Sequence, residues 1–313
     1  MHIGMSLTSH YPYDGQSRRH FTHLQERVAL MAELGFAALS LGDHHLTRDY
    51  YFQVLPTMAR LSAYSGTMRL LPLFLLPFYH PVLLAEQLGT LDVLCDGRLT
   101  VICCLGEQPE AHAAFQLRPQ ERVSRFEESF ALIRRLCCED HVSFHGRHFA
   151  FDNVCVQPKP LQQPLPMWIG AHADRAIRRA ARLADAWVIS PSWTPGHIEE
   201  KLQLYRQALQ AYGRSTQVTE VVLRRDLHLA ASPQTARREV EALLSRGYRG
   251  FSPQQLQESL IVGDAATCIR YLEHMQRLGI TLVLFRCALR EQDKALQTIR
   301  VLGTEVIPHF RQA

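Results

Sequence analysis

The sequence lacks an apolar stretch long enough to cross a membrane. Its longest apolar run, LLPLFLLPF over residues 70–78, has nine residues and two prolines. A membrane-spanning helix needs about 20 predominantly apolar residues. The N-terminus, MHIGMSLTSHYPYDG, also lacks the apolar core of a secretory signal peptide. These absences predict a cytoplasmic protein that does not enter the membrane.

Metal-type cysteine spacing and an excess of charge of one sign are absent as well. The eight cysteines form no C-x-x-C pair, a usage typical of a reducing compartment, where cysteine packs as a small apolar residue. The 34 basic and 30 acidic side chains nearly cancel, and the arginines are scattered over expected helix faces. We therefore expect neither a metal site nor a nucleic-acid partner.

No G-x-G-x-x-G motif follows the first apolar run, so a Rossmann dinucleotide site has no support. The sequence instead alternates short apolar runs with longer segments of helical periodicity. The expected strands are residues 2–7, 37–41, 68–76, 99–104, 167–170, 186–190, 221–230 and 281–286. Eight strands, each followed by a helix, predict an α/β protein with a single domain over residues 1–313, a (β/α)8 TIM barrel.

Glycine, proline and acidic residues mark where the helices begin and end. We expect helices over 18–35 and 81–97, each ended by a glycine, over 264–279 with an acidic N-cap, and over 291–307. Residues 141–166 interrupt the pattern, because they alternate like a hairpin and then become rich in proline. We interpret them as an insertion before strand five of the barrel.

Ionisable residues follow several expected strands directly. Active sites of (β/α)8 barrels lie at the carboxyl ends of the strands, so Asp43, His44 and His45 in the stretch LSLGDHH are candidates for chemistry. A zinc site is disfavoured because adjacent residues of an extended chain point to opposite sides. We expect one of the two histidines to be a hydrogen-bonded structural ring. Aromatic residues on the loop side could line an apolar pocket: Tyr11, Tyr13, Tyr50, Tyr51, Phe52, Phe74, Trp193 and Phe251.

Six ordered blocks of the sequence carry a resemblance to a known family. They are GDHHLTRDYYF (42–52), LPFYHPVLLAEQLGTLDVLCDGRLTV (76–101), RFEESFALIRRL (125–136), VSFHGRHFAFDNVCVQPKP (142–160), PMWIGAHADRAIRRAARLADAWV (166–188) and IVGDAATCIRYLEHMQRLGI (261–280). Together they resemble the bacterial-luciferase-like flavin-dependent monooxygenases, whose superfamily also holds F420-dependent oxidoreductases. The resemblance covers nearly the whole chain.

The resemblance implies a luciferase-like TIM barrel that binds reduced FMN (FMNH2) supplied by a separate flavin reductase. In this family the reduced flavin reacts with O2 at C4a, and the resulting peroxyflavin oxidises a small organic substrate. His44 matches the family's essential histidine, which implies general acid/base work near the flavin. Family members commonly form homodimers, and we expect a homodimer here. We expect the substrate to be an intermediate of secondary metabolism.

The resemblance also implies cofactor contacts at the ends of strands three and four. Cys104 matches a cysteine that lies close to the flavin ring, and Leu105 and Gly106 follow it. Leu105 stands where relatives commonly carry an arginine for the flavin phosphate. A non-prolyl cis peptide under the ring matches Pro72–Leu73 or one residue to either side, and a proline inside a central strand itself indicates irregular backbone.

The phosphate site implied by the resemblance departs from the family after the fifth strand. His172 and Ala173 occupy positions where relatives place a serine or threonine. Backbone amides after Gly170, at the start of the next helix, could hold a phosphate together with Arg175, whereas the carboxylate of Asp174 opposes a dianion.

These departures leave two alternatives to the FMN-dependent monooxygenase. The stretch LGEQPE (105–110) resembles F420-dependent enzymes, which would make the protein a hydride-transfer oxidoreductase with F420 as its cofactor. The absent phosphate contacts would instead suit a non-catalytic barrel that binds a flavin or a product.

Overall fold

Eight parallel strands close into a barrel in the computed structural model, which describes residues 1–215, 217–218, 220–248 and 252–311. Around the ring they are β1 (His2–Leu7), β3 (Ala38–Leu41), β5 (Arg69–Leu75), β6 (Val101–Cys104), β9 (Met167–Ala171), β10 (Ala186–Ile189), β11 (Glu220–Leu229) and β13 (Leu282–Cys287). Pairing of β10 with β11 and of β13 with β1 closes the ring. The predicted (β/α)8 barrel is confirmed, and every predicted strand lies within two residues of its observed bounds.

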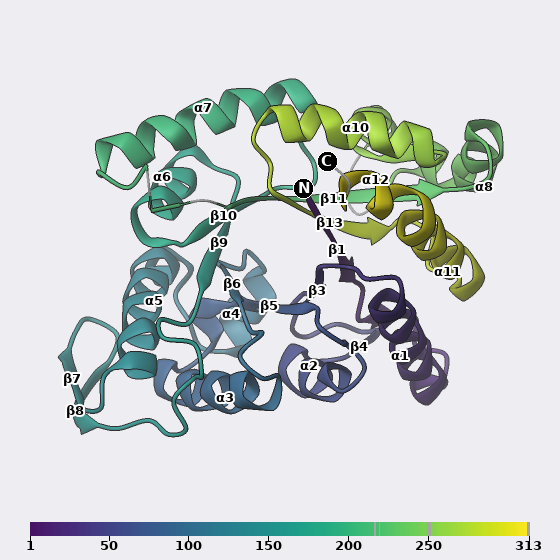
Figure 1. Ribbon diagram of the computed structural model, residues 1–313. Helices are drawn as coiled ribbons and strands as arrows, with labels where there is room; N and C mark the ends of the chain where they lie inside the picture. Colours follow the sequence, from purple (N-terminus) through teal and green to yellow (C-terminus); the bar gives the residue numbers. More distant parts are fainter. Residues whose placement is uncertain (216, 219, 249–251, 312–313) are drawn as a thin grey trace.

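Helices surround the barrel on all sides (Figure 1). They are α1 (Ser17–Glu33), α2 (Val54–Ser62), α3 (Pro81–Leu94), α5 (Arg122–Cys138), α6 (Asp174–Leu183), α7 (Pro195–Ala211), α10 (Ala265–Arg277) and α11 (Gln292–Val301). The last predicted helix continues beyond its expected end through a π-helical segment (Leu302–Val306) into α12 (Ile307–Arg311). Among the described helices, none is both long and apolar enough to cross a membrane.

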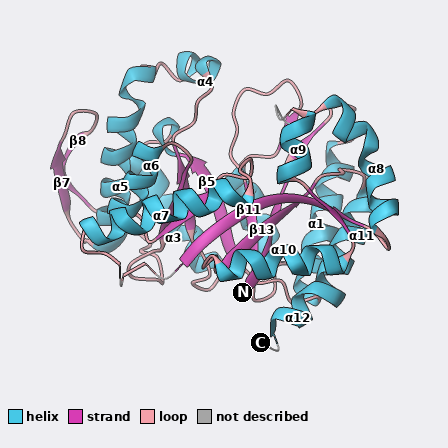
Figure 2. Ribbon diagram, turned by 90° about the horizontal axis from the view of Figure 1, so that it is seen from above, coloured by secondary structure: helices cyan, strands magenta, loops and turns pink. Residues whose placement is uncertain are grey.

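The predicted insertion before the fifth barrel strand is a hairpin. Strands β7 (Val142–His145) and β8 (Ala150–Val154) pair antiparallel and lie at the edge of the molecule, away from the barrel (Figures 1 and 2). The proline-rich stretch then leads back to β9. The hairpin therefore extends the barrel without interrupting its strand order.

Several further elements give no clear sequence pattern. Strands β2 (His10–Tyr11) and β4 (Tyr50–Tyr51) pair antiparallel, and β12 (Ile261–Gly263) pairs with the end of β11. The helices of this group are α4 (Pro109–Ala114), α8 (Pro233–Arg246) and α9 (Pro253–Ser259). In Figure 2, α4 and the N-terminus lie at opposite ends of the barrel, as expected for a helix that follows the carboxyl end of a strand.

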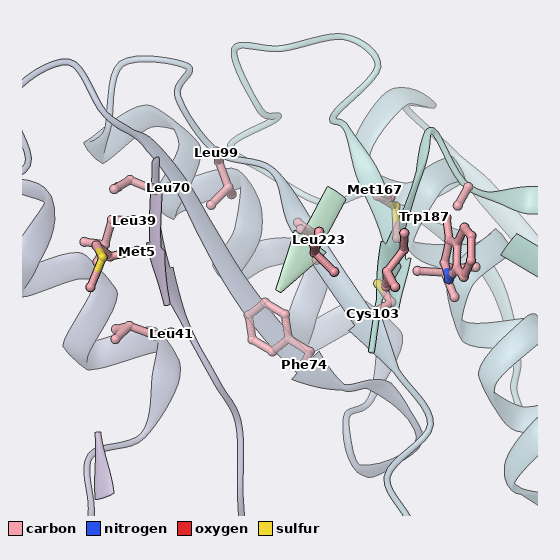
Figure 3. Packing of buried hydrophobic residues seen from close by; sticks show 14 of the residues in the cluster. Met5, Leu39, Leu41, Leu70, Phe74, Leu99, Cys103, Met167, Trp187 and Leu223 are labelled. Atoms are coloured by element: carbon pink, nitrogen blue, oxygen red, sulfur yellow. The ribbon is translucent and has the colours of Figure 1, made fainter. Parts of the chain in front are cut away.

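Alternate residues of the strands face opposite sides of the barrel wall. The outward-facing side chains, among them Met5, Leu39, Phe74 and Trp187, are buried beneath the helices (Figure 3). The inward-facing side chains form a separate apolar cluster, which includes Ala38, Leu71, Ile102, Trp168, Val222 and Leu282. The barrel interior is therefore filled and is not a channel.

A charged pair and a tryptophan close the end of the barrel where the strands begin. Arg69 donates two hydrogen bonds to the Glu220 carboxylate, at 3.0 and 2.8 Å. The Arg69 guanidinium also lies 4.9 Å from the ring centroid of Trp168, which is 1% exposed. Sites of TIM barrels lie at the other end, where the strands end.

The sequence-based prediction of a non-prolyl cis peptide at Pro72–Leu73 is wrong. The cis peptide bonds of the described residues precede prolines, at Gln157–Pro158 and Gln163–Pro164. Pro72 pairs in parallel register with β3, and Leu73 pairs with Ile102 of β6. Regular pairing with both neighbours keeps the backbone extended through this point, as trans peptides require.

Candidate active site

A cavity of about 410 Å³, here called the main cavity, opens at the carboxyl ends of β6, β9 and β10. Four residues predicted to contact a cofactor line its first wall: Leu73, Cys104, Leu105 and Gly106. Four more line it after β9: Gly170, His172, Ala173 and Arg175. Pro72 does not line it, because adjacent strand residues face opposite sides and Leu73 is the inward-facing one.

Two glycines shape the floor of the main cavity. A Cβ on Gly170 would lie 2.5 Å from the Cys104 sulfur, so the sulfur occupies the space that a side chain would need. Gly106 has a φ of 70°, a conformation that other residues rarely adopt, and a Cβ there would lie 2.9 Å from Phe78. Burial raises the pKa of the Cys104 thiol to about 12, so it stays neutral and is not a nucleophile at physiological pH.

Three arginines from two helices are among the residues that line the main cavity. Arg122 comes from the start of α5, and Arg175 and Arg179 come from α6. The Nε atom of Arg122 is buried and has no hydrogen-bond partner among the described atoms. Arg179 pairs with Glu127 at 2.7 Å. The main cavity therefore offers guanidinium groups to an anion.

Asp174, whose carboxylate is expected to repel a bound anion, has a basic partner. Its Oδ1 atom lies 2.9 Å from Nζ of Lys201 on α7. The hydrogen bond to Asp174 is the main cause that raises the pKa of Lys201. Asp174 does not line the main cavity, and Lys201 offsets its charge.

His44 lies beside the main cavity and not in its wall. Its Nε2 atom is 2.8 Å from the amide nitrogen of Gln108, which can donate to a neutral imidazole. Burial lowers the pKa of His44, and the nearby His10 and His45 act in the same direction. Gln108 directly follows Glu107, which does line the main cavity. His44 is therefore neutral and connected to the cavity through the loop after β6.

Asp43 joins the ends of β3 and β5. Its fully buried carboxylate accepts hydrogen bonds from the backbone N–H of Leu75 at 3.0 Å and from the Tyr79 hydroxyl at 2.9 Å. His45 lies 3.4 Å from the other carboxylate oxygen and contacts the ring of Phe78. Neither atom of the contact between His45 and Asp43 has a hydrogen-bond partner among the described residues, so His45 is held by ring packing, and the expected hydrogen-bonded structural ring stays a prediction. Asp43 and His45 fix the loop that presents His44.

The sequence misses the arginines that approach the main cavity from distant parts of the chain. Arg122 and Arg179 lie on helix surfaces and give no local signal. Arg224 on β11 also lines the main cavity, and here a signal exists, because the strand carries two consecutive arginines. Adjacent strand residues face opposite sides, so one of the pair must point into the barrel. Arg225 points outward and donates to the carbonyl oxygen of Trp193 at 2.7 Å.

The loop-side aromatic residues do not form the wall of the main cavity. The seven that are described are absent from its lining, and Phe251 lies outside the described residues. Tyr11 stacks on His20 with ring centroids 4.5 Å apart, and Phe74 and Trp193 pack against the outer core. The apolar wall is instead aliphatic.

The sequence of this chain is similar to those of known proteins. The family model described as luciferase-like monooxygenase matches residues 1–282. An uncharacterized protein of Mycobacterium tuberculosis is 34% identical over 113 residues, which cover 36% of this chain and only 38% of that relative. An F420-dependent glucose-6-phosphate dehydrogenase of Microbacterium testaceum is 24% identical over 316 residues, which cover 90% of this chain and 91% of the dehydrogenase.

Solved structures share the fold over its full length. Monooxygenase RslO1 from Streptomyces bottropensis superposes with a TM-score of 0.86 at 22% identity, covering 99% of this chain and 100% of that one. The oxygenating constituent of the 3,6-diketocamphane monooxygenase of Pseudomonas putida, in complex with FMN, gives a TM-score of 0.82 at 14% identity and 98% coverage of both chains. With most of its length matched by the family model, the chain belongs to the luciferase-like monooxygenase family of oxidoreductases.

Proposed function

We propose that this protein is the oxygenating component of a two-component, FMNH2-dependent monooxygenase that acts on a small organic substrate. The observation that carries the proposal is the main cavity, which is lined by aliphatic residues and arginines at the mouth of a luciferase-like barrel. Reduced FMN, when bound, supplies the electrons that activate O2. The protein supplies binding, orientation and exclusion of water.

The residues present fit FMN. Arg122 and Arg175 offer charge-assisted hydrogen bonds to a phosphate, in place of the arginine and hydroxyl contacts that Leu105 and Ala173 do not provide. The orphaned Nε atom of Arg122 indicates that a partner for this group is still to be supplied. Leu73, Cys104 and Val188 provide an apolar wall for an aromatic ring.

His44 is the residue proposed to move a proton. A neutral imidazole at pH 7 is a base, and the lowered pKa keeps it in that form. For the ring to accept a proton at Nδ1, Nε2–H donates to the side-chain amide of Gln108 through its oxygen, which has no other partner among the described atoms. The loop fixed by Asp43 sets the position of the ring. Asp43 is thus a positioning residue that acts through His44.

F420-dependent hydride transfer is the second candidate function. It is favoured by the match over 90% of this chain to an F420-dependent dehydrogenase, and by the arginines of the main cavity, which would also suit the phosphate of F420. The two candidates differ in what the bound cofactor does with O2.

An anaerobic titration with reduced FMN and, separately, with reduced F420 separates the candidates. Each complex is then mixed rapidly with oxygenated buffer while the cofactor absorbance is followed. Tight binding of reduced FMN and a protein-stabilised transient before oxidised flavin appears would support the monooxygenase. Binding of F420 alone would replace it with the hydride-transfer function. Tight flavin binding without any change in the rate of oxidation by O2 would identify a non-catalytic barrel.

The phosphate contacts are tested by comparing FMN with riboflavin, which lacks the phosphate. We expect Arg175→Ala and Arg122→Ala each to weaken FMN binding by about tenfold or more, because a hydrogen bond to a charged group contributes roughly 1.5–3 kcal/mol. Riboflavin binding should stay within twofold. Arg178→Ala on the same helix, an exposed residue that does not line the main cavity, is the matched control. Equal loss for both flavins would place the phosphate elsewhere.

The proposal includes a second copy of the chain, docked on α2 and α3. These helices leave a groove of about 380 Å³ lined by Leu55, Leu91 and Leu94, and Leu94 is 59% exposed. Exposed apolar grooves mark surfaces that another protein covers. Light scattering should find a dimer that Leu94→Arg converts to a monomer, whereas Tyr212→Arg on an exposed part of the chain after α7 leaves it intact. A dimer unchanged by Leu94→Arg would refute this interface.

The required partners are a flavin reductase, which must supply FMNH2, and O2. Turnover with NADH, a reductase and FMN, and no turnover without the reductase, would support this arrangement. A substrate from secondary metabolism and a cytoplasmic location stay predictions.

A further inference from the structure

A second, smaller cavity adjoins the main cavity and is here called the satellite cavity. It has a volume of about 130 Å³ and lies between α4 and the start of α5. Its charged and polar lining residues are His112, Gln116, Arg118, Glu121, Arg122, Arg125 and His148. Arg122 lines both cavities, so its side chain lies between them.

A buried histidine that lines this cavity has an unused ring nitrogen. His112 is 2% exposed, and its Nε2 atom lies 3.4 Å from the carbonyl oxygen of Gly106, which is long for a hydrogen bond. Its Nδ1 atom has no hydrogen-bond partner in the part of the chain that is described. In the tautomer that carries the proton on Nδ1, this nitrogen is a donor available to an anion. Buried polar atoms are normally paired, so an orphaned atom beside a cavity indicates a missing partner.

The described charges around the satellite cavity are predominantly positive. Its one lining carboxylate, Glu121, accepts a hydrogen bond from Arg147 at 2.8 Å and lies 3.9 Å from Arg118. The hydrogen bond from Arg147 is the main cause that lowers the pKa of Glu121, so this carboxylate stays charged and paired. The remaining cations exceed what Glu121 can offset.

Arg125 is held in place before any ligand arrives. Its Nε–H donates to the carbonyl oxygen of Pro77 at 3.0 Å, and its guanidinium lies 4.5 Å from the ring centroid of Phe149. A guanidinium fixed by packing loses little conformational entropy when it binds an anion. The satellite cavity is therefore preorganised for negative charge.

We propose that the satellite cavity binds an oxyanion, a carboxylate or a phosphate group, beyond the phosphate held in the main cavity. Its volume of about 130 Å³ has room for one such group. The inference deepens the proposed function and rests on the main cavity being the cofactor site. FMN has a single phosphate and would leave the satellite cavity empty, whereas F420 carries further acidic groups on its tail.

Two variants test the site at residues that do not themselves line the main cavity. Arg118 is 81% exposed, so Arg118→Glu reverses a charge at the satellite cavity with little effect on folding. His112→Phe removes the orphaned nitrogen and keeps a ring against Phe78, whose centroid lies 4.9 Å away. Arg277→Glu on α10, an exposed position on the opposite side of the barrel, is the matched control (Figure 1).

The probes are inorganic phosphate, F420 and FMN, with affinity measured by calorimetry for each protein. We expect Arg118→Glu and His112→Phe to weaken binding of phosphate or F420 by about tenfold, the effect of one charge-assisted contact, while FMN affinity stays within twofold. If only the affinity for F420 falls, the anion in the satellite cavity is part of the ligand that occupies the main cavity. Loss confined to phosphate identifies a free anion.

Unchanged phosphate and F420 affinities in both variants, or the same loss in Arg277→Glu, would overturn the proposal. Failure of wild-type protein to bind phosphate and F420 would do so as well. The phosphate measurement needs no flavin, so it remains decisive if the proposed oxygenase chemistry fails. Retained FMN affinity shows that each variant is folded.

Discussion

The contact between Gly170 and Cys104 allows a stability experiment with a defined sign. In Gly170→Ala the new methyl carbon would lie 2.5 Å from the Cys104 sulfur, so the two must separate by about 1 Å to reach ordinary contact. Overpacking of this kind costs about 1–3 kcal/mol in the free energy of unfolding. Cys104→Ala alone removes one buried atom and should cost about 1 kcal/mol.

The double variant separates this contact from any other effect of the substitutions. With the sulfur gone, the methyl group added by Gly170→Ala takes up part of the vacated space. We therefore expect the double variant to be more stable than the sum of the single effects predicts, by about 1–2 kcal/mol. Urea unfolding followed by circular dichroism, with linear extrapolation to water, measures all four proteins. Additive effects, or equal destabilisation by Gly170→Ala with and without the sulfur, would refute the reasoning.

Three further predictions concern the residues around the cavity mouth. Asp43→Ala should lower the free energy of unfolding by about 2–4 kcal/mol, because it leaves two donors, the Leu75 N–H and the Tyr79 hydroxyl, without their acceptor. Tyr79→Phe removes one of these hydrogen bonds and should cost only about 1 kcal/mol. Equal losses in urea unfolding would contradict this. Substrate oxidation should fall on acidification with a midpoint below pH 6.5, since the pKa of His44 is lowered from that value and protonation removes the base. The pH–rate profile of His44→Gln should lack that inflection, and an unchanged inflection would assign it to another group. Iodoacetamide should modify the exposed Cys155 well before Cys104, because burial raises the pKa of Cys104 and keeps it a thiol. Mass spectrometry that found the reverse order would contradict this.

The barrel could be predicted from the sequence because its signals are local. Short apolar runs separated by helices define the strands, and Gly35 and Gly97, both with positive φ, follow the ends of α1 and α3 as expected for helix C-termini. The strand β11 was recognisable although it contains Arg224 and Arg225, since its flanks are apolar. Local periodicity does not reveal that β12 pairs with β11, because that contact depends on the tertiary fold.

Site residues could be predicted only where they lie at the carboxyl end of a predicted strand. Residues at the end of β6 and directly after β9, such as Cys104 and His172, follow from the rule for strand ends. Arg122 could not be predicted, because it reaches the main cavity from a helix surface that looks like any solvated one. The cis peptide at Pro72 was inferred from family resemblance and not from this backbone, and regular strand pairing overrides it.

The closed end of the barrel, where Trp168 lies under the guanidinium of Arg69, restricts how ligands can enter and leave. In the described part of the chain, that end is plugged, so the ligands of the proposed monooxygenase would share the mouth at the other end. A used flavin would then have to leave before a fresh reduced one arrives, and a substrate bound first at the mouth would block the exchange. Binding in a fixed order, flavin before substrate, is what the proposed function requires of a barrel that is open at one end.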